Sequence, residues 1–471
     1  MLKPDFDDHA EEADLVELIE LFERFVETKE QHYFDEESLE RILEFYEMRN
    51  DFEKMEMVAD YAIEQNPYSS EFLIRKAELQ LQKKDYKACL EWLDKAIILD
   101  SHDIDIYLIK SDVFIETNQI DGAQEILEQA LLMVDTDEHD VIYAQLSDIF
   151  EMKEDFESAY DALSKALTLN PKSEDALQKT AHIVEMTDKF DESIKLHSEI
   201  IEKDPYLWLA WYNLGRAYTG VGLYEKALDA FEFVNAINED YDLAYREAAD
   251  VHYRKEEFEK AIQMFETAHD KSGGFEDYSF RIGLCYERNE NLKEARFHYR
   301  KAVRLDPFLD EAFFRIGETY RTEERFEAAI VNYKKALKID EDNEFYLSAL
   351  IRLYHKLDRE VDALSYQRRL VNSRSEIPSY WIDLIQLLYA QEEYAEALEL
   401  TNDALTRCGN YVEFYYLQSM LLWKTGKLKE SMSVLEHALA TDFKHHSIML
   451  DVDATFFHLD QVMELVEIYK K

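Results

Sequence analysis

The chain has 471 residues, and its 102 Asp and Glu residues outnumber its 53 Lys and Arg residues, which leaves a formal net charge of −49. This balance argues against direct binding of DNA or RNA, because a phosphate backbone is recognised by Lys and Arg. The chain contains only 10 glycines and 6 prolines, so little of it can be turn or linker. A hydrophobic content of 47% predicts a folded protein despite the charge.

The first residues and the cysteines indicate a cellular compartment. Residues 1–14 carry acids where a secretory signal has basic residues and an apolar run, and no stretch of about 18 apolar residues follows anywhere. Cys89, Cys285 and Cys408 are odd in number and far apart, which is typical of a reducing compartment. We expect a cytoplasmic protein that does not insert into a membrane.

Residues 1–35 precede the repeated part of the chain, and residues 14–28 within them predict a helix. Leu15, Leu18, Phe22 and Phe25 recur at three- and four-residue spacing and form one apolar stripe. We expect this helix to cap the exposed apolar face of the first repeat.

From residue 36 to residue 445 the chain repeats itself every 34 residues. Gly215, Gly283 and Gly317 occupy matching places, 68 and 34 residues apart, and the same register extends to twelve units. Position 20 of a unit is Ala, Ser or Cys in eleven of the twelve, and position 17 is bulky and apolar in eleven. A two-residue insertion, 138–139, is the one slip among units that begin at residues 36, 70, 104, 140, 174, 208, 242, 276, 310, 344, 378 and 412.

Each unit predicts a hairpin of two amphipathic helices, with small residues where two backbones cross closely. Gly222 and Gly426 stand at position 15, between the two helices. Gln367 and Thr401 interrupt apolar columns of the tenth and eleventh units, which predicts looser packing there. One hairpin cannot bury its apolar face alone, so the units must stack into a solenoid. Prolines that end the second helix occupy position 32 in four units: Pro67, Pro171, Pro205 and Pro307.

The best-conforming unit resembles a tetratricopeptide repeat in the run Trp211, Leu214, Gly215, Tyr218, Ala227 and Phe231. This resemblance covers residues 36–445 and implies an all-α fold, a right-handed α-α superhelical solenoid of tetratricopeptide repeats. It also implies a concave groove that binds protein or peptide segments. In that family the first helix of each unit lines the groove, and positions 2, 5, 9 and 12 face it.

Residues 446–471 follow the repeats and are too few for another full unit. Apolar residues at slipped helical spacing predict a short helical pair over 449–457 and 461–469. We expect this pair to cap the other end of the solenoid.

From the sixth unit onward, the four groove positions carry aromatic side chains and arginines, which are enriched in binding hot spots. Some of these aromatics could instead be covered by the neighbouring unit. We favour binding, because an exposed aromatic pair at 416 and 423 would otherwise be a liability. The candidate peptide-binding groove comprises Tyr212, Arg216, Arg246, Tyr253, Phe280, Phe314, Arg321, Arg352, His355, Tyr389, Tyr416 and Trp423.

In the first five units the same positions carry acids and no Lys or Arg. Either these acids recognise basic segments, or they only keep a long solenoid soluble. Position 9 is never Asn, so the sequence does not support the clamp that some members of the family use for acidic chaperone tails. The candidate acidic groove comprises Glu37, Glu40, Glu44, Glu78, Asp105, Asp112 and Asp148.

No catalytic or cofactor motif has the spacing that its chemistry requires. The chain contains no GxGxxG, GxxxxGK[ST], HExxH or GxSxG sequence. The adjacent His445 and His446 are interpreted as a solvated loop, and the acidic stretch 340–344 lacks the glycine of a calcium loop. We therefore expect no cofactor, no metal and no enzymatic activity.

The sequence predicts a non-catalytic interaction scaffold whose partners are other proteins or peptides, basic ones among them. Two alternatives stay open: a self-associating structural element, and a regulatory or substrate-docking subunit of a larger enzyme assembly. The oligomeric state is left open as well. Hinges are predicted at the insertion 138–139 and at the only Gly-Gly pair, 273–274.

Overall fold

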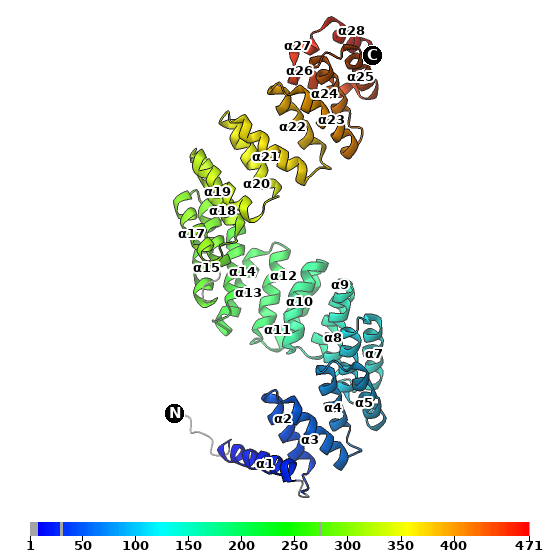
Figure 1. Cartoon of the computed structure of the whole chain (residues 1–471). Helices are drawn as coiled ribbons and strands as arrows, with labels where there is room; N and C mark the ends of the chain where they lie inside the picture. Colours follow the sequence, from blue (N-terminus) through cyan, green and yellow to red (C-terminus); the bar gives the residue numbers. More distant parts are fainter. Residues whose placement is uncertain (1–7, 29–31, 273–275, 471) are drawn as a thin grey trace. The chain divides into compact units, whose positions relative to one another are not determined.

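The computed structural model describes residues 8–28, 32–272 and 276–470, and within these ranges all regular secondary structure is helical. The chain divides into two compact units, residues 1–247 (the N-terminal unit) and residues 248–471 (the C-terminal unit). Figure 1 shows the helices of both units coloured along the sequence. The predicted hinge at 273–274 lies outside the described residues, and the insertion at 138–139 lies at the start of α8.

In the N-terminal unit, α1 (Asp8–Thr28) is followed by antiparallel helical hairpins, as the repeat pattern predicts. Helices that are consecutive in sequence pack against each other. The hairpins are α2 (Glu36–Met48) with α3 (Phe52–Gln65), α4 (Ser70–Gln82) with α5 (Tyr86–Leu99), α6 (Ile104–Glu116) with α7 (Ile120–Met133), α8 (His139–Met152) with α9 (Phe156–Leu169), α10 (Glu174–Thr187) with α11 (Phe190–Lys203), and α12 (Trp208–Gly220) with α13 (Tyr224–Ile237).

The boundary between the two units falls within α14 (Asp242–Arg254), which is followed by α15 (Phe258–Ser272). After the hairpins of the C-terminal unit come a 3-10 turn, η1 (Phe443–Ser447), and the short helices α26 (Ile448–Val452), α27 (Ala454–Phe457) and α28 (Asp460–Tyr469). The hairpins are α16 (Glu276–Arg288) with α17 (Leu292–Leu305), α18 (Asp310–Thr322) with α19 (Phe326–Ile339), α20 (Glu344–Lys356) with α21 (Glu360–Ser373), α22 (Pro378–Ala390) with α23 (Tyr394–Cys408), and α24 (Val412–Lys424) with α25 (Leu428–Thr441).

The turn inside each hairpin has the same backbone geometry in all twelve repeats. Position 15 adopts a left-handed conformation, with φ between 53° and 81°. Glycine, which takes this conformation without strain, stands there only at Gly222 and Gly426. In the other ten repeats Asn, Asp, Lys or Glu occupies the position. At the next position, Asp51, Asp85 and Asp155 each accept a backbone hydrogen bond and cap the second helix, so part of the acidity has a local structural role.

In three repeats a small residue at position 8 of the first helix lies against a large one at position 24 of the second. Gly215, Gly283 and Gly317 lie against the rings of an aromatic residue at position 24, closer than a Cβ would allow. In the tenth and eleventh repeats the sizes are exchanged: an isoleucine at position 8 lies opposite Gln367 or Thr401. Both polar side chains are buried and hydrogen-bonded, so they are accommodated in the core, and the looser packing of these repeats stays a prediction.

Helices outside the repeats cover apolar residues at both ends of the chain. Ile19 and Phe22 of α1 are buried in one core with Phe34 and Tyr46. At the other end, Met449, Phe456 and Val462 belong to the core that includes α22 and α24.

Candidate functional site

The face formed by the first helices of the repeats is the place where the sequence predicts a groove. First helices of consecutive repeats lie side by side, since α4 contacts α6, α10 contacts α12 and α22 contacts α24. Between three other pairs of consecutive first helices, α6 and α8, α8 and α10, and α14 and α16, position 9 of one repeat is bonded to position 6 of the next. The bonds run from Gln145 to Asp112 at 2.8 Å, from Lys179 to Asp148 at 2.9 Å and from Arg281 to Asp250 at 2.7 Å.

These bonds correct the predicted acidic groove for Asp112 and Asp148, and a pair within α4 corrects it for Glu78. Asp112 and Asp148 are half-buried and tied to the next repeat, and Glu78 is half-buried and accepts a hydrogen bond from Arg75 at 3.2 Å. Burial raises the pKa of all three carboxyl groups. They are structural ties rather than free carboxylates. For Asp112 and Asp148, the sequence already contained a signal of this pairing. At position 6 of the next repeat, Gln or a cation stands 31–33 residues after the acid.

The remaining members of the acidic groove differ in exposure. Glu37, Glu44 and Asp105 are exposed, whereas Glu40 is half-buried beside Glu71 of the next repeat. Burial, and then the hydrogen bond between the two carboxyl groups, raises the pKa of Glu40 to about 7. At neutral pH this carboxyl pair therefore carries less than its full formal charge.

Most of the predicted groove aromatics are core residues, so the prediction that they are exposed is wrong. The Tyr212 ring lies 5.2 Å from that of Tyr241, and the Phe280 ring lies 5.4 Å from that of Tyr299, measured between ring centres. Each of these rings packs against another residue of its own repeat. A comparison of residue types at one repeat position does not reveal this packing. The exposed fractions are 5% for Tyr212, 8% for Phe280, 6% for Tyr389 and 0% for Tyr416.

In the last two repeats, the C-terminal segment covers the predicted groove aromatics. The Tyr389 hydroxyl donates to Asp453 Oδ2 at 2.6 Å, and Lys424 Nζ lies 2.8 Å from the same carboxylate. Trp423 is half-buried, with its ring centre 5.5 Å from that of Phe456. The expectation of an exposed aromatic pair at 416 and 423 is therefore wrong, because residues after the twelfth repeat fold onto it.

Four further predicted groove residues are half-buried and have partners within their own unit. Their side chains already contribute to the packing of the repeats and are not free for a ligand. The pairs are Arg216 with Glu185, Arg246 with Glu247 at 2.8 Å, His355 with Glu360 at 2.9 Å, and Tyr253 with Phe258 at 5.8 Å between ring centres.

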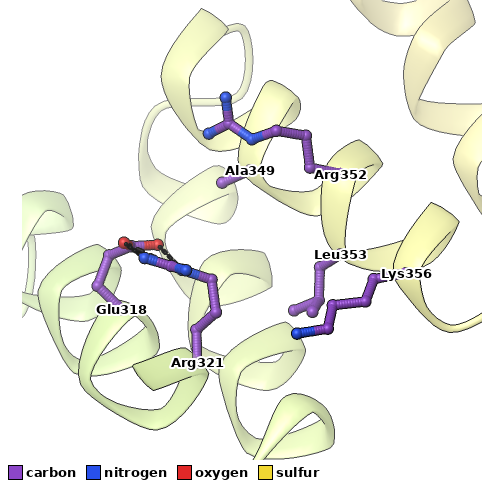
Figure 2. Close-up of a pocket in the computed structure, with 6 residues that line it drawn as sticks. All are labelled: Glu318, Arg321, Ala349, Arg352, Leu353 and Lys356. Atoms are coloured by element: carbon purple, nitrogen blue, oxygen red, sulfur yellow. Dashed lines mark hydrogen bonds and ion pairs between the residues drawn. The ribbon is translucent and has the colours of Figure 1, made fainter. Parts of the chain in front are cut away.

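The other three predicted residues, Phe314, Arg321 and Arg352, come together on α18 and α20 in the ninth and tenth repeats. A cavity of about 300 Å³ lies here, and Figure 2 shows the residues that line it: Glu318, Arg321, Ala349, Arg352, Leu353 and Lys356. Two nitrogens of Arg321, Nε at 3.1 Å and Nη2 at 2.8 Å, donate to the carboxylate of Glu318. Arg352 is exposed, and its guanidinium forms no hydrogen bond or ion pair with the part of the chain that the structure describes.

The cavity exists because position 6 of the tenth repeat is Ala349. In the fourth, fifth and eighth repeats a long side chain at this position crosses to the preceding repeat, as Lys179 and Arg281 do. Without such a partner, Glu318 accepts hydrogen bonds from Arg321 and from the Tyr333 hydroxyl. Burial opposes ionisation of Glu318, but these two hydrogen bonds outweigh it and hold the pKa of the carboxyl below its usual value.

A second cavity, of about 520 Å³, lies on the same two helices and shares Arg352 with the first. Its aromatic lining consists of Phe314, Phe345 and Tyr346. Phe314 stacks on Tyr346 with ring centres 4.8 Å apart, and Phe345 is 74% exposed. Asn343 caps α20 by accepting from the backbone N–H of Phe345 at 3.0 Å, which fixes this end of the helix. The two cavities together are called the repeat 9–10 site below.

The repeat 9–10 site lies in the least acidic part of the chain. The N-terminal unit contains 61 acidic and 23 basic residues, whereas the C-terminal unit contains 41 and 30. The eighth to tenth repeats, residues 276–377, contain 20 acidic and 19 basic residues. The local field therefore differs in kind from that of the N-terminal unit.

The remaining metal-ligating and nucleophilic side chains give less support for a functional site. In the described ranges, no group of three or more His, Cys, Asp and Glu side chains is placed to hold a metal ion. No helix among the described residues is long and apolar enough to span a membrane. Cys89 and Cys285 are buried, and burial raises the pKa of each thiol to about 12, so both are protonated at neutral pH.

Comparison with known proteins identifies the repeated unit. Models of the tetratricopeptide repeat match residues 141–173, 209–241, 277–309, 310–343 and 412–445. Each match begins within one residue of a unit start in the 34-residue register. The matches and the register therefore describe the same repeat.

Individual relatives are distant. The BBSome complex member BBS4 of Mus musculus is 23% identical over 145 residues, which are 31% of this chain and 28% of that relative's length. Among solved structures, MamA is 27% identical (36% of this chain, 93% of that chain, TM-score 0.32) and YrrB, described as a TPR protein with an unusual peptide-binding site, is 19% identical (42% and 97%, TM-score 0.32). The APC/C hetero-tetramer Cut9-Hcn1 is 12% identical (83% and 97%, TM-score 0.33).

Proposed function

Because this chain is a tetratricopeptide repeat protein, we propose that it is a non-catalytic scaffold that holds segments of other proteins on the face formed by its first helices. The observation that carries the proposal is the repeat 9–10 site. There the first-helix face keeps two adjoining cavities and an unpaired guanidinium, Arg352, whereas most other predicted groove aromatics and cations are engaged within the chain.

The N-terminal unit supports a second, weaker contact surface for basic segments. Glu37, Glu44 and Asp105 are exposed on its first helices, and the unit has 61 acidic against 23 basic residues. Such a field attracts cationic partners and repels nucleic acids. We further propose a cytoplasmic location, on the grounds of the three free cysteines, and function without a cofactor, because no cofactor motif in the sequence has the required spacing.

The scaffold proposal is tested with the affinity-tagged full chain, crosslinked through lysines in native lysate and analysed by mass spectrometry. Lys356 on α20 is an exposed lysine of the first-helix face, and Lys338 on α19 is an exposed lysine of a second helix. We expect partner crosslinks at Lys356 and few at Lys338. Arg352→Glu should weaken partner retention, whereas Arg304→Glu, the same charge change at an exposed position of α17, should not.

Three results would contradict the proposal. Partner crosslinks confined to second helices would place recognition on the opposite face. Purification of the chain with copies of itself alone would favour the self-associating element. Partner loss in both arginine variants alike would point to net charge rather than to a site. Co-purification with a separate catalytic subunit would identify the scaffold as the docking part of an enzyme assembly.

A further inference from the structure

We propose that the repeat 9–10 site binds an acidic segment of a partner protein in which a carboxylate side chain stands next to an aromatic or aliphatic one. The carboxylate enters the cavity left by Ala349, and the apolar side chain packs on Phe314 and Phe345. This inference rests on the proposed scaffold function and names the ligand chemistry of one site within it.

The charge of the first cavity selects an anion. Its lining contains three cations, Arg321, Arg352 and Lys356, and one carboxylate, Glu318. Glu318 is already satisfied by Arg321 and by the Tyr333 hydroxyl. Arg352 and Lys356 both lie on α20, and the Lys356 ammonium lies over the Phe326 ring of α19, 4.5 Å from its centre, so Arg352 is the cation that offers a direct contact while Lys356 adds to the positive field. The planar guanidinium of Arg352 interacts with Glu318 only through its charge and forms no hydrogen bond or ion pair with the described residues, and its geometry matches that of a carboxylate.

The second cavity selects the residue beside the carboxylate. Phe345 is 74% exposed, so its ring is accessible to a ligand side chain. Phe314 and Tyr346, stacked 4.8 Å apart, form the floor next to it. Because Arg352 borders both cavities, a ligand that fills both places its acidic and apolar groups on neighbouring residues.

The first cavity is open to a ligand because no side chain at position 6 of the tenth repeat crosses to Glu318 of the ninth. At position 6 of the fourth repeat, Gln145 crosses to Asp112 of the preceding repeat. The tenth repeat has Ala349 there, so the equivalent space beside Glu318 stays open to a ligand. The surrounding repeats, with 20 acidic and 19 basic residues, do not repel an acidic segment as the N-terminal unit would.

The test is fluorescence anisotropy with the purified full chain and a labelled peptide with blocked termini, Gly-Ser-Asp-Asp-Phe-Asp-Asp-Ser-Gly. We expect saturable binding that weakens between 50 and 500 mM NaCl, as expected of ionic contacts. The same peptide with Asn for every Asp, or with Ser for Phe, should bind at least tenfold more weakly. Because both termini are blocked, binding cannot depend on a terminal carboxylate.

Two variants and one control connect the binding to the site. Ala349→Gln copies Gln145, fills the cavity without adding charge and should weaken peptide binding at least tenfold. Arg352→Gln removes an exposed side chain, so the chain should fold normally while the affinity falls by a similar factor. Arg304→Gln on α17 makes the same charge change elsewhere and should alter the affinity less than twofold. Circular dichroism of each variant verifies that the helices are intact.

The proposal is overturned if the peptide shows no saturable binding, or if Ala349→Gln and Arg352→Gln bind it as well as the unmodified chain does. Binding that appears only after removal of residues 1–14, which contain Asp5, Phe6 and Asp7, would also overturn it, because the chain's own acidic start would then be the occupant. Since the peptide assay uses purified protein, its failure is separate from a failure of the lysate experiment, which alone judges the scaffold function.

Discussion

We predict that Gly317→Ala destabilises the C-terminal unit, although alanine is the better helix former. A Cβ at this position of α18 would lie 2.5 Å from Cδ1 and 2.5 Å from Cε1 of Tyr333, and 3.3 Å from the carbonyl oxygen of Ala329. Tyr333 has little freedom to move, because its side chain is fully buried and its hydroxyl is bonded to Glu318 in the repeat 9–10 site.

Two opposing contributions set the size of the effect. Replacing a helical glycine by alanine favours the helix by about 1 kcal/mol. Forcing an extra carbon into a packed contact costs roughly 1–3 kcal/mol, because neighbouring side chains must leave their rotamers. The expected net loss is therefore up to about 2 kcal/mol in the free energy of unfolding. The second repeat shows the compensating pair, since Ala77 at position 8 lies opposite Leu93 at position 24.

The pair Ala77 and Leu93 suggests a second substitution that should restore the stability lost in Gly317→Ala. Tyr333→Leu should remove the clash in the Gly317→Ala background, so the double variant should be more stable than the two single effects predict by about 1 kcal/mol or more. Repeat arrays can unfold in parts, so the urea midpoint of the full chain is combined with amide hydrogen exchange in α18 and α19. If Gly317→Ala proves as stable as the unmodified chain, or Tyr333→Leu does not rescue it, the size compensation described above is not an energetic constraint.

Three further predictions concern the turn, the acidic pair and the C-terminal cap. Glu324→Gly should raise the unfolding free energy by roughly 0.5–1 kcal/mol, measured as a higher urea midpoint, because the backbone at this residue has a φ of 58°, which glycine adopts without strain. Glu324→Gln, which removes the charge but not the strain, should leave the midpoint unchanged. Because the pKa of Glu40 rises from 4.5 to about 7 on folding, the folded chain holds a proton that the unfolded chain releases, and stability falls as pH rises through this window. Glu40→Gln should flatten that fall in thermal unfolding between pH 5 and 8, and an unchanged slope would contradict the assignment. Burial disfavours ionised Asp453, yet hydrogen bonds from Lys424 and Tyr389, among others, hold the pKa of its carboxyl well below the usual value. Its stabilisation is therefore present above about pH 4 and lost as pH falls. At pH 7, Asp453→Asn should destabilise the packing of α26–α28 by roughly 1–3 kcal/mol, seen as faster amide exchange there, whereas equal exchange would show that the charge is dispensable.

The sequence by itself determined the repeat and the places where its helices begin. Every second helix starts at position 17, and every first helix starts at the first residue of its unit except α8, which begins one residue earlier at His139. This succeeds because helix formation follows local information, namely apolar spacing and turn residues within one 34-residue unit. The sequence also marked Gly222 and Gly426 as turns, but it did not show that the same left-handed turn recurs with ten other residues in place of glycine.

Only the tertiary structure decided which side chains of the first-helix face are free. Tyr416 and Phe345 both stand at predicted groove-facing positions, yet Tyr416 is fully buried and Phe345 is 74% exposed. Tyr416 is buried in the C-terminal core, where its hydroxyl donates to the carbonyl oxygen of Asp442, and the neighbouring groove residue Trp423 is covered by Phe456, which follows the twelfth repeat. In the same way, the cavity at Ala349 depends on a side chain that fails to cross to the preceding repeat. Exposure and ion pairing are properties of contacts between repeats, and a column read within one repeat contains no information about them.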